Sequence, residues 1–470
     1  MHHKGRTISL IIVIASLAFL FFGSVIRELM QMQESYIEGY AGKETVRIWY
    51  ADEVLSDYIN NAAVTYGQEK DLRVIPTLAS ESEYLEAINQ ASVQTDSVPD
   101  LFVLSNDSLE KAYLAGLATE ITDEDSVVNS DNFPKVALDA VTYKDKKVAY
   151  PFYYETSALL YNETYLLEWA KQQVLGSNED GDSLTEEEFE ALEGEEQPKQ
   201  ETTQMSEEEL MEKSREYMIQ HLPTTVDDIL TIANSFNPPE GVDLIFSWDV
   251  SDIFYNYYVV GNYLNVGGER GDDATQLNIY NEQTVACLEA YKALNQFFSI
   301  ESNTVDYDEV IDDFLSGKTV FTIATTDVLK RIEAAKAEEA FAFDYGLCMM
   351  PDINADLQGR SLSVTGTVVV NGYSEKKEHA NDFAEFLTVD YASHLYERTG
   401  KVSANIHVMG ENPGLEIFMA EYSESVSLPK MIQTSNLWLQ LEVLFAKVWN
   451  GGNTDELLQN LATQIASQLN

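Results

Sequence analysis

The stretch that decides the fold is residues 98–122, VPDLFVLSNDSLEKAYLAGLATEIT. Its centre, Leu101 to Leu104, is a short and wholly apolar run, which is typical of a buried strand in a parallel sheet. The polar residues Ser105, Asn106 and Asp107 follow at once. Ligands of open α/β sheets bind beyond the carboxyl ends of the strands. We therefore expect residues 105–107 to border a binding site.

Strand and helix patterns alternate around this stretch, which indicates an α/β protein with a parallel sheet. The β-branched and aromatic residues Thr45–Tyr50 predict the first strand, and a second strand is predicted to end at Pro76. Long helical patterns dominate the C-terminal third. The expected strands are 45–50, 72–75 and 101–104, and the expected helices are 56–69, 81–94, 284–298, 377–387, 438–449 and 454–469. A further helix is expected to begin after a cap at Thr225 or Thr224, with Asp227 and Asp228 in its first turn.

Composition and charge exclude several classes of function. The 470 residues correspond to about three domains' worth of chain. The chain carries 29 Lys and Arg against 79 Asp and Glu, a formal net charge of −50, which argues against nucleic acid and against an anionic lipid surface. Two cysteines, Cys287 and Cys348, exclude a disulfide framework and leave open whether they form one bond or two buried thiols. We expect no metal and no cofactor.

The N-terminus indicates where the protein resides. Residues 8–26, ISLIIVIASLAFLFFGSVI, form an uncharged run of 19 residues that follows Lys4 and Arg6. This length suits one transmembrane helix, and the basic flank places the bulk of the chain outside the membrane. Residues 27–44 are then expected to form a short stalk. A cleaved signal peptide is the alternative, and it places the chain on the same side.

One segment departs from the α/β pattern. Residues 176–214 hold 15 acidic residues against two lysines, Lys199 and Lys213. Low hydrophobicity and high net charge predict a disordered insertion, with a helical tip over 186–192 or 207–213.

Seven segments together are similar to the extracellular solute-binding proteins of bacterial ABC importers, in the sugar-binding branch that includes maltose-binding protein. The segment 98–122 resembles that family's strand, ligand loop and helix, and 143–167 (YKDKKVAYPFYYETSALLYNETYLL) resembles its first crossing between lobes. The remaining segments follow in the family's order. They are 221–236, 317–332, 344–353, 364–388 and 428–465.

The resemblance implies an α/β, two-lobed periplasmic-binding-protein-like fold (type II) with a ligand cleft between the lobes, here with an N-terminal transmembrane helix. Lobe 1 would comprise residues 45–150 and 363–408, and lobe 2 would comprise 151–362 and 409–470. Such proteins close around a solute by hinge bending and deliver it to permease subunits in the membrane, without chemistry. The implied function is delivery of a carbohydrate, a sugar or oligosaccharide, to an ABC importer on the surface of a bacterial cell.

The resemblance also implies ligand-binding residues, because sugars need aromatic faces and hydrogen-bonding carboxylates or amides. Asp107, Glu155 and Trp438 match two carboxylates and a stacking tryptophan of the family. Each has a structural alternative, respectively a helix cap, a partner of a surface lysine and a core residue. The full set of expected ligand-binding residues is Tyr50, Asp52, Glu53, Asn106, Asp107, Glu155, Tyr257, Asp327 and Trp438.

The chain departs from the maltose-binding pattern at two places. Leu104 and Thr325-Thr326-Asp327 stand where those proteins have tryptophans. A smaller sugar, or a cationic solute such as a polyamine drawn by the acidic candidates, is therefore an alternative ligand. A cell-surface sensor or scaffold that keeps the fold without transport is the alternative function. No motif singles out a catalytic pair, so we do not expect an enzyme.

Overall fold

The computed structural model describes residues 42–93, 98–123, 126–179, 205–298, 300–302, 304–408, 410, 412–434 and 436–469. The predicted transmembrane segment, residues 8–26, lies outside this range, as does nearly all of the predicted stalk. Within the described part of the chain, no helix combines the length and the apolar character needed to span a bilayer.

Three strands of the first lobe run parallel, as the sequence predicts. Strand β1 (Thr45–Tyr50) lies between β2 (Arg73–Leu78) and β3 (Leu101–Ser105) and pairs in parallel with both. The first four residues of β3 are buried, in keeping with its apolar sequence. The helices that follow the three strands are α2 (Ser56–Glu69), α3 (Tyr84–Ser92) and α4 (Leu109–Leu114).

The second strand does not end at Pro76, as predicted, but continues to Leu78. Among the strands of the described residues, β2 is at the edge of the sheet and has β1 as its one neighbour. Proline has no backbone N–H to donate, and an edge strand tolerates this because one side of its backbone needs no partner strand.

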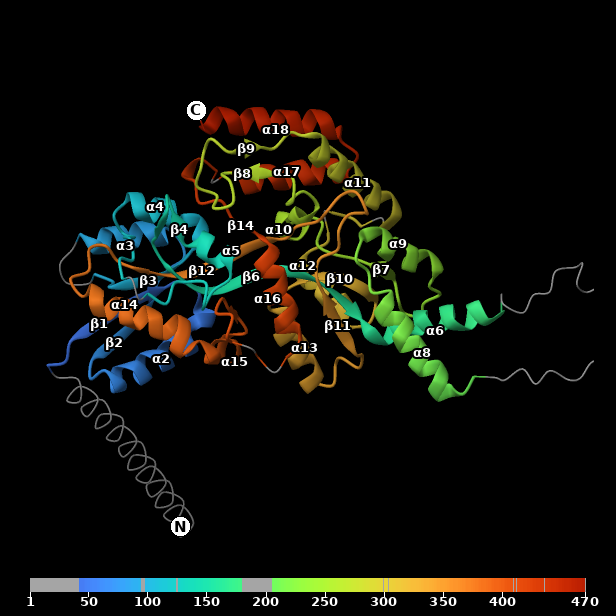
Figure 1. Cartoon of the computed structure of the whole chain (residues 1–470), viewed down its shortest axis with the longest axis horizontal. Coiled ribbons are helices and arrows are strands. Elements are labelled where there is room, and N and C mark those ends of the chain that lie inside the picture. Colours follow the sequence, from blue (N-terminus) through green and yellow to red (C-terminus); the bar gives the residue numbers. More distant parts are fainter. Residues whose placement is uncertain are drawn as a thin grey trace, which may run out of the picture.

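The sheet is mixed rather than wholly parallel, which corrects the sequence prediction. Strand β12 (Leu362–Val370) runs antiparallel to β3 on one side and to the long strand β6 (Tyr150–Asn162) on the other. Beyond β6 the order continues through β10 (Thr319–Thr325) to β7 (Leu244–Phe246). Figure 1 shows β6 and β12 passing between the two halves of the molecule. The lobes are therefore joined within one continuous sheet.

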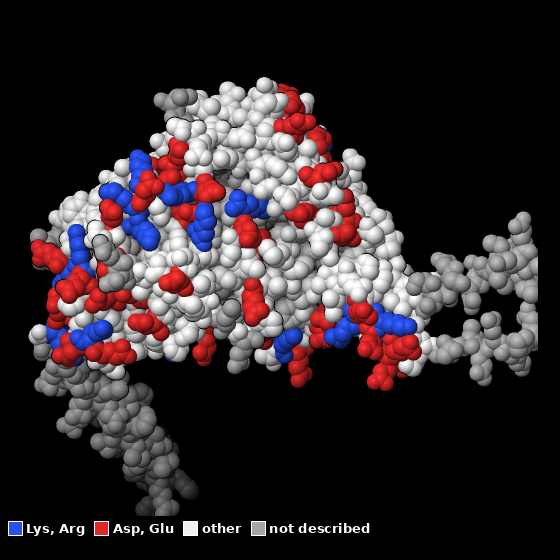
Figure 2. Space-filling view, viewed as in Figure 1, with Lys and Arg blue, Asp and Glu red and all other residues white. Residues whose placement is uncertain are grey.

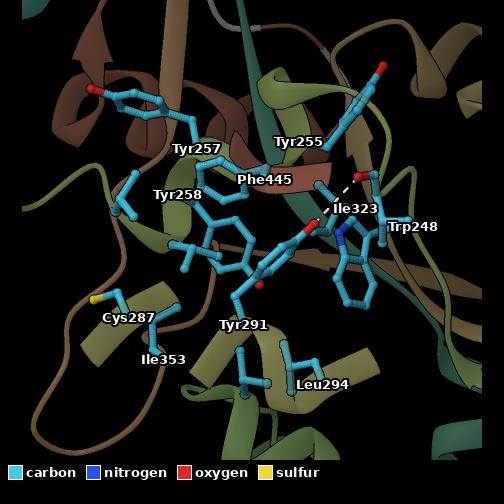
Figure 3. Close-up of a cluster of buried hydrophobic side chains, with 14 of the residues drawn as sticks. Trp248, Tyr255, Tyr257, Tyr258, Cys287, Tyr291, Leu294, Ile323, Ile353 and Phe445 are labelled. Carbon is cyan, nitrogen blue, oxygen red and sulfur yellow. Dashed lines mark hydrogen bonds between the residues drawn. The ribbon is translucent and has the colours of Figure 1, made fainter. Parts of the chain in front are cut away.

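Each lobe has a hydrophobic core of its own, and a third core contains residues of both lobes, among them Val136 and Tyr422. Phe152 at the start of β6 packs in the first core with β1 to β3 and α2, whereas Leu159 further along the same strand packs in the second. The second core is rich in aromatic rings (Figure 3). Trp248 is fully buried there, stacked on Phe246 at 4.6 Å and edge-on to Trp449 at 5.5 Å.

Helices cover the second lobe on both sides of its sheet, and α17 and α18 lie together at the top of Figure 1. Apart from α6 (Glu163–Glu179) and α8 (Glu207–Gln220), which are described next, the helices of this lobe are α9 (Val226–Ser235), α10 (Ile253–Asn256), α11 (Glu282–Phe298), α12 (Tyr307–Leu315), α13 (Val328–Ala337), α16 (Gly414–Glu424), α17 (Leu437–Trp449) and α18 (Thr454–Leu469). The other elements used below are α5 (Lys135–Ala140), β4 (Thr142–Tyr143), β5 (Lys146–Lys147), β8 (Asn265–Val266), β9 (Leu277–Asn278), β11 (Tyr345–Cys348), α14 (Lys377–Glu385), α15 (Leu395–Thr399) and β13 (Val402–Ser403).

Two helices lead into and out of the acidic insertion. α6 (Glu163–Glu179) and α8 (Glu207–Gln220) pack against each other, and the Trp169 and Tyr217 rings lie 5.5 Å apart between them. Ser206 caps α8 by accepting a hydrogen bond from the Glu209 N–H. The helix predicted over 207–213 is therefore confirmed and extended, and these residues are not disordered. The helix considered over 186–192 lies outside the described residues.

Candidate functional site

A cavity of about 1080 Å³ lies at the carboxyl ends of β1 and β3, the edge of the sheet that the sequence predicted. Asp52 and Glu53 reach it from the end of β1, and Glu155 reaches it from β6. Three of the nine expected ligand-binding residues are thus brought together. The lining residues are Ala51, Asp52, Glu53, Glu81, Glu83, Tyr84, Leu85, Glu86, Val103, Leu104, Ser105, Ser108, Lys111, Tyr153, Glu155 and Lys401.

Lys401 joins two of the expected carboxylates. Its Nζ lies 3.0 Å from Asp52 Oδ2 and 2.8 Å from Glu155 Oε1. Burial by itself lowers the pKa of the Lys401 ammonium, but Glu155 and then Asp52 outweigh burial and leave that pKa well above its ordinary value. Lys401 is therefore a permanent cation in this cavity at any physiological pH. The alternative reading of Glu155, that it pairs with a lysine, is what the structure shows.

Both carboxylates are held in defined positions. Asp52 Oδ1 accepts a hydrogen bond of 3.0 Å from the Val54 N–H, so each Asp52 oxygen has a partner. Glu155 differs, because Oε2 has no hydrogen-bond partner among the described residues and its side chain is 42% exposed. Glu155 Oε2 is consequently an acceptor that a bound solute can use.

The ring of Tyr153 completes the surroundings of Lys401. Tyr153 and Glu155 are two residues apart on β6, so both side chains lie on the same face of the sheet. Lys401 Nζ lies 4.6 Å from the centre of the Tyr153 ring, which is a cation–π distance. On the neighbouring strand, Gly366 makes room for this ring, because a Cβ at that position would lie 2.3 Å from it.

The residues at 105–107 border the cavity unequally. Ser105 and Ser108 line it, and the Ser105 hydroxyl donates to Asp107 Oδ1. Asn106 is fully buried instead. Its Nδ2 donates to Ser427 Oγ at 3.1 Å and to the Leu428 carbonyl at 2.9 Å, and its Oδ1 accepts from the Thr365 N–H. In this arrangement Asn106 ties the end of β3 to chain segments that lead into the second lobe.

The other expected residues do not line this cavity. Tyr50 is buried in the first core and donates to Ser56 Oγ at 3.2 Å. Tyr257 and Trp438 contact each other edge-on in the second lobe, with ring centres 5.8 Å apart, and the Tyr257 ring lies at the margin of the aromatic cluster in Figure 3. Asp327 follows β10 and pairs with Arg331 at 2.7 Å. Their assignment to a ligand site stays a prediction.

Sequence reasoning missed two central residues of the cavity, Tyr153 and Lys401. The spacing of two between Tyr153 and Glu155 was a signal that one face of β6 carries both side chains. No comparable signal marks Lys401, which lies 246 positions from Glu155 and enters the cavity only because β13 pairs with β6.

A second charged region joins the lobes. The loop between β8 and β9 approaches α5 and the β4–β5 hairpin, where Lys135 pairs with Glu269 at 2.6 Å and Arg270 pairs with Asp145 at 2.5 Å. In Figure 2 lysines, arginines and acids are mixed over this region, which surrounds a cavity of about 910 Å³. Such exposed ion pairs each contribute up to about 1 kcal/mol to stability. Because these pairs join the β8–β9 loop to α5 and to the β4–β5 hairpin, we regard the region as a contact between lobes rather than as a ligand site.

Lys430 is a buried residue of the same contact between the lobes. Its side chain is fully buried, and its Nζ donates to the Asp139 carbonyl at 2.9 Å and to the Arg270 carbonyl. No carboxylate oxygen forms an ion pair with it among the described residues. Burial therefore lowers the pKa of Lys430 to about 8, despite the neighbouring charges of Asp272 and Asp139.

The fold and the site define a class of protein: a two-lobed α/β binding protein with an open cavity at the strand ends. Among the described residues no cluster of His, Cys, Asp or Glu is arranged to hold a metal ion. The chain belongs to the bacterial extracellular solute-binding protein family, whose model matches residues 61–392. The family is one of binding proteins rather than enzymes.

Solved structures support the same fold. The chain is similar to an extracellular solute-binding protein from Staphylococcus aureus in complex with maltose, with 18% identity, a TM-score of 0.69, and coverage of 90% of this chain and 97% of that one. It is also similar to a cyclo/maltodextrin-binding protein complexed with maltotetraose (17% identity, TM-score 0.68, coverage of 91% and 97%). A third similar structure is the maltose-binding periplasmic protein MalE from Listeria monocytogenes in complex with maltose. Its identity to this chain is 18% and the TM-score is 0.65, with coverage of 90% of this chain and 97% of that one. No curated protein matches the chain in sequence.

Proposed function

We propose that this protein is a membrane-tethered extracellular solute-binding protein that captures a carbohydrate by hinge bending and delivers it to an ABC importer. The structural relatives named above were solved with maltose or maltotetraose bound. The apolar run at residues 8–26 supports the tether. The two strands that cross between separate cores support hinge bending, because a rotation there moves one lobe against the other.

The observation that carries the proposal is the open acceptor on Glu155 inside the cavity of about 1080 Å³. That volume accommodates a small carbohydrate. Ser105 and Ser108 add hydroxyl groups to the lining, and Asp107, which does not line the cavity, accepts a hydrogen bond from the Ser105 hydroxyl. Sugar hydroxyls both donate and accept hydrogen bonds, and a lining of this kind satisfies both roles.

Leu104 is 8% exposed and lines the cavity without an aromatic face. The aromatic residues of the lining are Tyr84 and Tyr153, and Lys401 already lies over the Tyr153 ring, so the lining favours a short sugar. Trp438 would supply a stacking face if closure of the lobes brings α17 toward the cavity. Closure of this kind is the motion that binding is expected to favour.

The test is a thermal-shift and calorimetric screen of the full-length chain in detergent with glucose, maltose, maltotetraose and spermidine. A ligand that binds only the folded state stabilises it by about 2.7 kcal/mol at a hundredfold excess over its Kd. We expect a sugar to raise the midpoint, and Glu155→Ala and Asp107→Ala to abolish that shift. Glu339→Ala, a change at an exposed loop residue outside the cavity, should leave it intact.

Other outcomes redirect the function. Spermidine binding without sugar binding would overturn the carbohydrate ligand while keeping a solute-binding role. Absence of any shift with all four compounds would favour the sensor or scaffold alternative. Delivery is tested separately, by uptake of the radiolabelled sugar in the source bacterium with and without this gene.

A further inference from the structure

Lys401 is held in place from both sides along the chain. Helix α15 ends at Gly400, whose φ of 77° is a left-handed conformation that favours glycine. The Lys401 N–H then donates to Thr399 Oγ1 at 3.0 Å, and the next residue, Val402, pairs with Tyr154 of β6. The backbone of Lys401 is thus fixed between a helix end and a strand, and its side chain is only 17% exposed.

The Lys401 ammonium and the carboxylates around it form several contacts with one another and still leave hydrogen-bonding capacity for a solute. A lysine ammonium has three N–H donors; Lys401 donates one of them to Glu155 Oε1 and forms an ion pair with Asp52 Oδ2. At least one N–H of Lys401 is therefore left, on the ammonium group that contacts the Glu155 carboxylate through Oε1. A donor and an acceptor therefore stand side by side in the cavity, and each is charged.

We propose that Lys401 is a specificity-determining residue, which makes the site select neutral polyhydroxylated solutes over cations. This inference rests on the proposed function. A hydroxyl group accepts from the Lys401 N–H and donates to Glu155 Oε2 at the same time. A solute ammonium group offers donors only, and it would meet the fixed positive charge of Lys401 beside the very carboxylates that it needs.

The same arrangement disfavours anions. A solute carboxylate would accept from Lys401 but would face the negative charges of Glu155 and Asp52 within a few ångströms. The six acidic residues of the lining point toward a cationic ligand, as the sequence did. Lys401 opposes that reading where it pairs with Asp52 and Glu155, and Lys111 is a second cation of the lining.

The proposal is tested by calorimetry on the full-length chain in detergent with maltose, maltotetraose and spermidine. For the unchanged chain we expect sugar binding at least about a hundredfold tighter than spermidine binding. Lys401→Met keeps much of the side-chain length and removes the charge. It should weaken sugar binding at least about tenfold and strengthen spermidine binding at least about tenfold. Lys401→Arg should restore the original preference, because it restores the cation.

The matched control is Lys330→Met on α13. Lys330 also lies over a tyrosine ring, 4.7 Å from the centre of Tyr396, and pairs with Glu333 at 3.1 Å, but it does not line the cavity. Its loss should change neither affinity. Circular dichroism spectra and thermal midpoints establish that each variant is folded.

Three outcomes would overturn the proposal. One is equal affinity of the unchanged chain for spermidine and sugar, which needs no variant. The second is Lys401→Met with an unchanged ratio of the two affinities, which would make Lys401 a purely structural residue. The third outcome arises if the unchanged chain binds no sugar, which by itself overturns only the proposed function. In that case the selectivity proposal is judged on whether Lys401→Met gains spermidine binding, and no gain overturns it too.

Discussion

The rings of Tyr154 and Tyr422 stack face to face, with centres 4.0 Å apart and planes inclined by only 2°. Tyr154 belongs to the crossing strand β6, and Tyr422 belongs to α16. The Tyr422 hydroxyl also shares a hydrogen bond of 2.7 Å with Thr365 Oγ1 on β12, the second crossing strand. Both rings are fully buried. One tyrosine thus fixes α16 to both strands that join the lobes.

This relationship predicts a large stability effect at position 422. Tyr422→Ala removes a buried ring and should lower the free energy of unfolding by about 3–5 kcal/mol. Tyr422→Phe keeps the stack and loses one hydrogen bond, at a cost of about 1 kcal/mol. Urea unfolding followed by circular dichroism measures both. Equal effects of the two substitutions would show that the stack contributes little.

The room that Gly366 leaves for Tyr153 gives a second prediction. In Gly366→Ala the new methyl group would meet the Tyr153 ring at 2.3 Å, so the ring must move away from its place beside Lys401. We expect a loss of about 1–3 kcal/mol of stability, together with weaker binding of whichever sugar the screen identifies. Gly176→Ala on α6 is the matched control, because a methyl group there meets no neighbour within 4 Å. A full-affinity Gly366→Ala variant would mean that Tyr153 has no influence on the site.

The two cysteines give a third prediction. Both are free thiols, Cys287 in α11 and Cys348 in β11, and burial raises the pKa of each to about 12. Because the thiolate is the reactive form, iodoacetamide at pH 8 should modify neither thiol in the folded chain and both in urea. Mass spectrometry of the intact protein counts the added groups. Rapid labelling without denaturant would place at least one sulfur in contact with solvent.

Local patterns predicted the elements well, because they depend on neighbours in sequence. β1, α2 and α18 have the predicted bounds, and Thr225, one of the two residues expected to cap α9, does so within a full capping box with Asp228. The prediction at Pro76 failed because edge position is a property of the sheet and not of the strand. The mixed direction of the sheet was missed for the same reason, since β12 returns to the first lobe from far along the chain.

The candidate site was predictable only in part. Asp52 and Glu53 line the cavity, and they were expected there because they follow the first strand, where the resembled family places polar contacts. Glu155 was placed by the family resemblance. Lys401 changes the charge of the site, yet its position depends on the pairing of β13 with β6. Asn106 satisfies the strand-end pattern but turns inward, because the buried backbone of Leu428 and Thr365 needs its amide.

Lys430 yields the last prediction, a dependence of stability on pH. Its pKa is about 8 in the folded chain and 10.5 by ordinary values in the unfolded chain. Between these pH values the unfolded chain holds more protons, so the free energy of unfolding rises with pH. The gain in stability that comes from the neutral form of Lys430 is complete above pH 10.5, and it is lost as the pH falls through 8. This difference between the two pKa values corresponds to about 3 kcal/mol in the free energy of unfolding.

The measurement is urea unfolding of the full-length chain and of Lys430→Met between pH 7 and 10.5. Subtracting the variant removes the titration of the many buried tyrosines, whose raised pKa values destabilise the folded state only at higher pH. We expect the stability of the unchanged chain, relative to Lys430→Met, to increase steadily over this range. A constant difference would mean that the Lys430 ammonium keeps its ordinary pKa, and therefore that the contact between Lys430 and the carbonyls of Asp139 and Arg270 is open to water.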